Sequence, residues 1–164
     1  MSRILFAALF WAIAALTAQS QEITGRAVAY DTDKIAVGDQ RILLYGIDSL
    51  DRGQQTCYID RQRWGCYAVA LRTLQILVDD GPVTCREVDE HDLYGRTWAV
   101  CVIEGRDVAE TMVRAGWAFA YRPQTDRYVA DEEEAKAEGV GLWQSEFLLP
   151  WEWRKNVDMD EADR

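Results

Sequence analysis

Alternating apolar and polar positions along much of the chain predict an antiparallel sheet. The segments that alternate in this way are residues 23–30, 34–37, 41–47, 83–88 and 97–102. Turn residues such as Asp31, Gly38 and Asp39 separate the first three segments. The last two are joined by a turn that contains the sequence DLYGR. We therefore expect a three-stranded meander followed later by a hairpin.

A helical period replaces the alternation in three other segments. Residues 67–78 carry apolar side chains at helical spacing and are followed by Asp80 and Gly81, which favour a helix end. Residues 108–115 and 127–138 predict two further helices, each followed directly by a glycine. Five short strands with one helix after the third are typical of an OB-fold barrel. The expected fold class is α+β, a five-stranded OB-fold barrel with about three helices.

The first twenty residues have the layout of a secretory signal peptide. Arg3 precedes an apolar run over residues 4–16, and small or polar residues follow. A membrane anchor is the alternative, but a run of about 13 residues is shorter than the roughly 20 needed to span a bilayer. We expect a signal peptide over residues 1–20, one domain over residues 21–157 and an acidic, disordered tail over residues 158–164. The mature protein would be periplasmic or secreted, with no stable membrane insertion.

All four cysteines follow the predicted signal peptide, so an oxidising compartment favours two disulfides. Of the three pairings that four cysteines allow, we expect Cys57 with Cys66, which closes a short loop. Cys85 with Cys101 would then join two strands of the predicted hairpin. A zinc site is the alternative, but the spacings lack a CxxC pair and His91 is the single histidine.

Charge argues against easy binding of nucleic acid. Without residues 1–20 the chain has 17 basic residues against 28 acidic ones, a formal net charge of −11. A strongly negative protein repels a polyphosphate at long range unless basic groups cluster locally. Any phosphate-binding function therefore needs a local group of cations.

Three motifs in order carry a resemblance to a known family. They are YDTDKIAV at residues 30–37, LLYGIDSLD at residues 43–51 and DLYGRTWAVC at residues 92–101. In sequence and rough spacing they resemble the staphylococcal nuclease (thermonuclease) family over about residues 23–156. The ending GLWQSEFLLPWEWRKN is similar to that of secreted proteobacterial members with two disulfides. This resemblance implies the same OB-fold, and we expect Trp143, Trp151 and Trp153 to pin the ending over the barrel.

The resemblance also implies a site for cleaving phosphodiesters. In this family two aspartates hold calcium, a glutamate acts on the attacking water, and two arginines bind the phosphate. The metal ligands correspond to Asp33 and Asp48, with the carbonyl of Ser49 as a third. The second arginine corresponds to Arg96. Tyr94 and Tyr121 match aromatic positions that flank the nucleotide. Plain turn chemistry is the alternative role for the two aspartates.

Two positions depart from the family pattern at the chemistry itself. Leu43 stands where the first arginine is expected, and leucine cannot bind phosphate. Asp51 replaces the glutamate, which shortens the catalytic side chain by roughly 1.5 Å, and an error of about this size can cost a hundredfold in rate. Lys34 replaces a threonine, where it would either oppose the cation or bind substrate phosphate. Arg41, about 6.6 Å along the strand from Leu43, could substitute as the catalytic arginine or simply face solvent.

These observations predict an exported relative of calcium-dependent nucleases whose catalysis is weak or lost. One alternative is an active non-specific nuclease that uses Arg41 and takes single-stranded DNA or RNA. Another is a non-catalytic periplasmic module for binding or assembly with a protein partner. We expect a monomer in each case.

Overall fold

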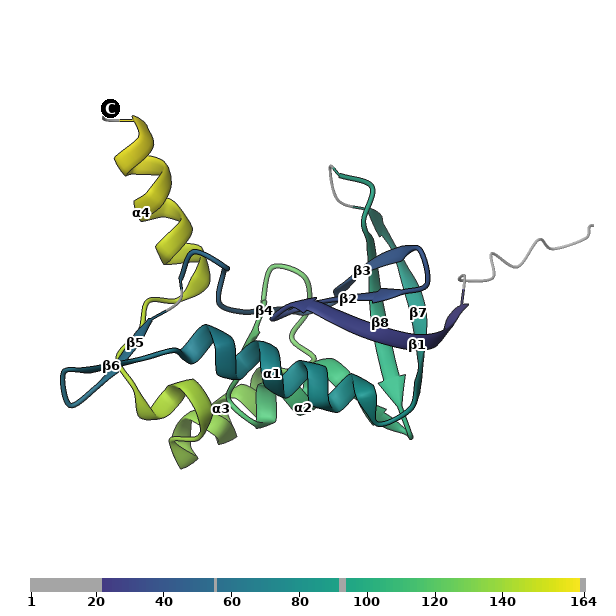
Figure 1. Ribbon diagram of the computed structural model, residues 1–164, viewed down its shortest axis with the longest axis horizontal. Helices are drawn as coiled ribbons and strands as arrows, with labels where there is room; N and C mark the ends of the chain where they lie inside the picture. Colours follow the sequence, from purple (N-terminus) through teal and green to yellow (C-terminus); the bar gives the residue numbers. More distant parts are fainter. Residues whose placement is uncertain (1–21, 55, 92–93, 163–164) are drawn as a thin grey trace, which may run out of the picture.

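Five strands form a closed barrel in the computed structural model, which describes residues 22–54, 56–91 and 94–162 (Figure 1). The strands are β1 (Glu22–Asp31), β2 (Lys34–Val37), β3 (Gln40–Leu44), β7 (Pro82–His91) and β8 (Thr97–Ile103). Neighbours pair antiparallel in the order β3-β2-β1-β7-β8, and parallel pairing of β3 with β8 closes the barrel. The expected fold class is thereby confirmed.

Short strands complete the sheet structure. β9 (Arg106–Asp107) extends the barrel sheet, β4 (Ile47–Asp48) pairs with β10 (Phe119–Ala120), and β5 (Cys57–Ile59) pairs with β6 (Gln62–Trp64). The sequence predicts one strand over residues 41–47, but the structure interrupts it at Gly46, whose φ is 81°. A Cβ there would lie 2.6 Å from Thr125 Cγ2 and 2.8 Å from the Tyr128 ring, so the bend requires glycine.

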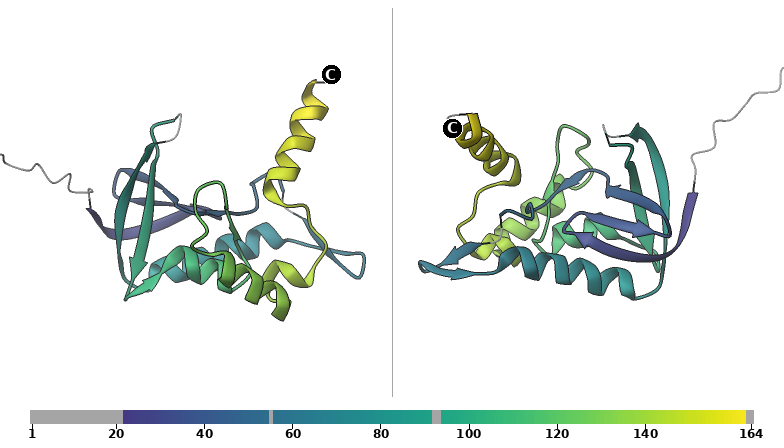
Figure 2. Two further views of the ribbon diagram at one scale, coloured as in Figure 1. Left: turned by 180° about the vertical axis from the view of Figure 1, so that it is seen from behind. Right: turned by 45° about the horizontal axis from the view of Figure 1, so that its top comes forward.

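Helices cover one side of the barrel (Figures 1 and 2). α1 (Cys66–Asp79) runs along β1, and α2 (Val108–Arg114) packs against β8 and α3 (Val129–Glu138). The three expected helices are present within two residues of their predicted ends. A 3₁₀ turn (Gly141–Gln144) follows α3.

A fourth helix, α4 (Pro150–Ala162), ends the described chain and projects from the body of the molecule (Figure 2). None of the three helices predicted from the sequence lies in this segment. It begins with proline, which suits the first helical position, and contains no glycine that would stop it. The helix therefore enters the segment that was predicted to be a disordered tail.

The hydrophobic interior has two parts. The first fills the barrel and the space beneath α1 and α2. The second gathers around Phe119, whose ring lies 5.3 Å from those of Trp143 and Phe147 and 6.2 Å from that of Trp151. These contacts hold the chain ending against β10, as expected for Trp143 and Trp151, whereas Trp153 packs on Gly53 in the loop after β4.

Both expected disulfides are present. Cys57 and Cys66 have Cα atoms 5.7 Å apart, and Cys85 and Cys101 lie opposite each other on β7 and β8 with Cα atoms 4.0 Å apart. All four thiols are consumed, so the zinc alternative is excluded. The predicted signal peptide lies outside the described residues. Within the described ranges, no helix combines the length and apolar character needed to cross a bilayer.

We predict that replacing Cys57 and Cys66 together by serine lowers the free energy of unfolding by about 2–4 kcal/mol, because the unfolded chain regains the entropy of the closed loop. Urea unfolding of the oxidised proteins measures the difference. A loss below about 0.5 kcal/mol would contradict the prediction.

Candidate active site

One pocket at the mouth of the barrel collects the polar side chains of the three motifs. The site pocket has a volume of about 610 Å³, and a neighbouring hollow of about 480 Å³ shares Tyr94 and Arg96 with it. The end of the β7–β8 hairpin and α4 rise on the same side of the molecule, and both contribute to this pocket (Figures 1 and 2). Its lining residues are Asp31, Asp33, Lys34, Leu43, Ile47, Asp48, Asp51, Tyr94, Arg96, Trp98, Tyr121 and Arg154.

The turn between β1 and β2 places a lysine between two aspartates. Lys34 Nζ lies 2.9 Å from Asp31 Oδ2 and 2.8 Å from Asp33 Oδ1. The turn is tied to the loop after β4, because the buried Thr32 hydroxyl donates to the Leu50 carbonyl at 2.7 Å. Lys34 therefore faces the site and neutralises its carboxylates.

Burial and charge set the protonation of this turn. Burial raises the pKa of Asp33 to about 6, with the nearby Asp48 and Asp31 contributing to the rise and Lys34 opposing it. Burial alone would raise the pKa of Asp31, but the hydrogen bond and charge of Lys34, together with hydrogen bonds from Thr32 and Tyr67, outweigh burial and lower that pKa. For Lys34, burial favours the neutral amine, yet Asp33 and Asp31 together raise its pKa above the ordinary value.

An arginine from α4 occupies the other side of the pocket. Arg154 binds Asp48 through both guanidinium NH groups, and its Nη1 also lies 2.7 Å from Asp51 Oδ2. Burial alone would lower the pKa of Arg154, but its hydrogen bond to Asp48 and the charges of both aspartates raise it. The fork geometry is the one in which guanidinium recognises oxyanions.

Close packing positions α4 against the loop that carries Asp51. A Cβ at Gly53 would lie 2.5 Å from Trp153 Cη2, so this glycine allows the indole to sit directly on the loop. Gln54 Nε2 donates to the Leu148 carbonyl just before the helix. These contacts of α4 with the loop therefore keep Arg154 in the site pocket.

Arg96 and Leu43 form the barrel wall of the pocket. The Arg96 guanidinium lies 5.3 Å from the ring centre of Tyr94, whose side chain is 83% exposed. Leu43 is buried, and β-sheet pairing places it between Lys34 and Trp98. The side chain expected to be arginine is therefore an apolar part of the pocket wall.

The structure brings most of the predicted site residues together. Asp33, Asp48, Asp51, Lys34, Arg96, Tyr94 and Tyr121 all line the site pocket. Arg41 instead lines a neighbouring hollow of about 480 Å³, which includes Tyr94 and Arg96. Sequence reasoning missed Arg154, because nothing in the local sequence WEWRKN distinguishes it from an ordinary surface arginine.

The donor chemistry fits a hard divalent cation. Asp33 and Asp48 offer carboxylate oxygens close enough for their charges to repel, which a bound cation would relieve. Within residues 22–54, 56–91 and 94–162, no group of three or more acidic, histidine or cysteine side chains is placed to hold a metal. Two carboxylates would thus need further oxygen ligands from backbone, water or substrate.

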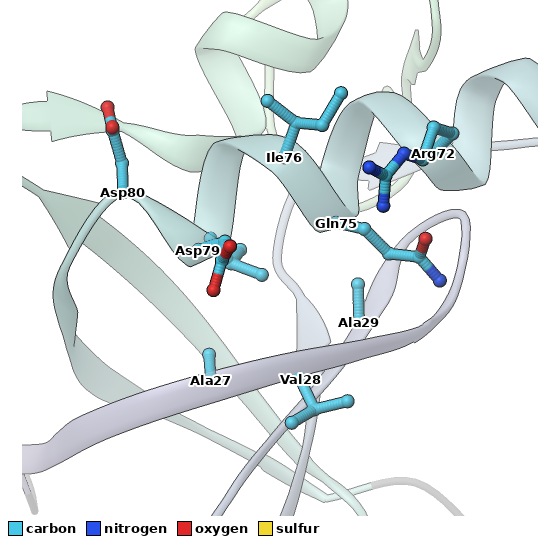
Figure 3. A pocket seen from close by; sticks show the side chains of 9 residues that line it. Ala27, Val28, Ala29, Arg72, Gln75, Ile76, Asp79 and Asp80 are labelled. Carbon is cyan, nitrogen blue, oxygen red and sulfur yellow. The ribbon is translucent and has the colours of Figure 1, made fainter.

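A second hollow, of about 420 Å³, lies between β1 and α1 (Figure 3). Ala27 and Ala29 point toward the helix and Val28 points away. Among the described residues it shares no lining side chain with the site pocket, and none of the motif residues reaches it. The motif residues single out the pocket at the barrel mouth.

A closed five-stranded barrel, here with carboxylates and arginines at its mouth, places the chain in the class of OB-fold domains. The family model described as Staphylococcal nuclease homologue matches residues 41–145. The chain belongs to the staphylococcal nuclease family.

Individual relatives point the same way. Endonuclease YncB of Bacillus subtilis (strain 168) is 36% identical over 61 residues, 34% of this chain and 29% of the relative. SPbeta prophage-derived endonuclease YokF of the same strain is 38% identical over 61 residues, 34% and 21% respectively. Staphylococcal-like nuclease CAN1 of Arabidopsis thaliana is 28% identical over 134 residues, 80% of this chain and 38% of the relative. The chain thus spans well under two-thirds of these curated relatives.

We predict that Asp33→Asn increases the free energy of unfolding more at neutral than at acidic pH. The folded state holds the Asp33 proton more tightly than the unfolded chain, so the wild type loses stability as the pH rises from 3.8 to about 6. Asparagine removes that loss, worth roughly 3 kcal/mol. Urea unfolding at both pH values, with chelator present, measures it, and a pH-independent difference would contradict the prediction.

Proposed function

We propose that the chain is a weak, calcium-assisted nuclease that cleaves phosphodiesters in single-stranded DNA or RNA. The observation that carries this proposal is the convergence of Asp33, Asp48, Asp51 and Arg96 in one pocket. These residues come from three separate motifs and four places in the fold. Among the described residues, the pocket lining carries three cations against four aspartates, so a bound divalent cation would have to offset the repulsion expected from the net charge.

Each side chain has a distinct role in the proposed reaction. Asp33 and Asp48, with the carbonyl of Ser49, would hold calcium, which supplies Lewis-acid polarisation of the phosphate when bound. Asp51 accepts the proton of the attacking water as general base. Arg96 donates to phosphate oxygens and offsets their growing charge.

Substrate contacts extend beyond the reacting phosphate. Tyr94 and Tyr121 line the pocket and offer ring faces to a nucleotide. Arg41, in the neighbouring hollow that includes Tyr94 and Arg96, binds the next phosphate along the strand. Lys34 acts on the substrate only through its effect on the charge of Asp33.

Two features limit the rate. Asp51 has a shorter reach than glutamate, and Leu43 supplies no charge to the pocket wall. Losing one electrostatic donor to the transition state costs on the order of a hundred- to a thousandfold. The activity is therefore expected to be well below that of an efficient enzyme.

A non-catalytic binding module is the second candidate. Its supporting observation is that Lys34 and Arg154 already neutralise the carboxylates that a metal would need. In that role the protein binds a periplasmic partner and shows no cation-dependent cleavage. We further propose export to the periplasm or medium as a monomer, supported by the N-terminal sequence pattern and the two disulfides.

We predict slow cleavage of single-stranded DNA that requires calcium and stops with a chelator. Asp48→Asn should lower the rate on the order of a hundredfold or more, because one of the two carboxylates proposed to hold calcium is lost. Asp60→Asn, in the exposed β5–β6 turn, is the matched control and should keep the wild-type rate. A wild-type protein with no cleavage in calcium would favour the binding module.

We predict that Asp51→Glu increases kcat by roughly ten- to a hundredfold with little change in KM, because it restores the reach of the general base. Asp51→Asn should abolish the reaction. Steady-state cleavage of a labelled oligonucleotide measures both variants. An Asp51→Glu variant no faster than wild type would show that base reach does not limit the rate.

A further inference from the structure

The site pocket contains a cation that the family motifs do not provide. The guanidinium of Arg154 lies over Asp48 and Asp51, in the same pocket whose wall carries Leu43 and Arg96. Arg154 comes from α4, more than a hundred residues from Asp48 in the sequence. Ordinary ion pairing at the surface does not explain why an arginine from so distant a helix lies in this pocket.

Several contacts show that the position is built into the fold. Trp153, the preceding residue, sits on Gly53 in the loop that carries Asp51. Trp151, three residues before, packs its ring 6.2 Å from Phe119 and 6.4 Å from Tyr121, another residue of the site pocket. The contacts of Trp153 and Trp151 therefore fix α4 against the chain segments that form the site.

We propose that Arg154 is a phosphate-binding residue of the site and replaces the arginine that Leu43 does not supply. This inference rests on the proposed nuclease function. In the structure, the Arg154 guanidinium donates hydrogen bonds to the carboxylates of Asp48 and Asp51. A divalent cation on Asp48 takes over the neutralisation of that carboxylate and frees guanidinium donors.

A phosphate oxyanion is the natural new acceptor for those donors. Guanidinium binds phosphate and carboxylate with the same bidentate geometry, so Arg154 needs little rearrangement of its helix. Its side chain is 41% exposed, which leaves part of the fork accessible to an incoming strand. Arg154 and Arg96 both line the site pocket, so its described lining contains two guanidinium groups.

The test measures binding separately from cleavage. Arg154→Gln is compared with Lys155→Gln, which removes the same charge from an exposed neighbour on α4. The probe is a short, fluorescently labelled single-stranded DNA with phosphorothioate linkages, read by anisotropy in calcium over a range of salt concentrations. Circular dichroism and thermal melting establish that each variant is folded.

We expect Arg154→Gln to weaken binding about ten- to a hundredfold, and Lys155→Gln to change it little. The slope of log affinity against log salt should fall by about 0.7, the value for one phosphate contact on a single strand. Arg154→Lys should recover only part of the affinity, because it lacks the fork. Leu43→Arg combined with Arg154→Gln should restore affinity and salt slope, since charge returns to the pocket from β3.

Two results would overturn the proposal. Tighter binding or faster cleavage by Arg154→Gln would show that Arg154 blocks the site against cation and substrate. Unchanged affinity and salt slope in that variant would show that Arg154 only holds α4 in place. Failure of the nuclease proposal is distinct, because it appears as absence of cleavage by the wild type whatever Arg154 does to binding.

Discussion

Mutual repulsion among aspartates at the mouth of the barrel is the constraint around which the site is organised. Asp31, Asp33, Asp48 and Asp51 share one partly buried pocket, where low dielectric strengthens their repulsion. Lys34 offsets the charge on the side of the β1–β2 turn and Arg154 does so on the side of α4. These two cations offset the repulsion where the β1–β2 turn and the loop after β4 meet.

The neutralising contacts also connect separate parts of the chain. Thr32 joins the β1–β2 turn to the loop after β4 through its bond to the Leu50 carbonyl. Gly53, in that loop, receives the indole of Trp153, and Arg154 then reaches back to Asp48 and Asp51. The chain ending is thus part of the site, and its packing and its charge act together.

The ionised carboxylates that this site needs to bind a cation lower the stability of the folded protein. The raised pKa of Asp33 means that its ionised form is costly in the folded protein, although an ionised carboxylate is what a cation needs. The apolar Leu43 reduces polarity in the pocket wall, while Arg154 supplies charge from outside the barrel. The family scaffold therefore retains its acidic side and shifts part of its basic side to α4, a change that a comparison of motifs alone does not reveal.

Local pattern in the sequence determined the barrel strands, the three helices that cover it and the two disulfides, because alternation, helical period and spacing are short-range signals. Motif order was enough to predict that Asp33, Asp48, Asp51 and Arg96 belong to one site. Only the tertiary structure decided that Arg41 faces a neighbouring hollow, that Lys34 turns inward and that Arg154 enters the pocket. These outcomes depend on barrel closure and on the packing of Trp153 against Gly53, contacts between distant segments that no local pattern encodes.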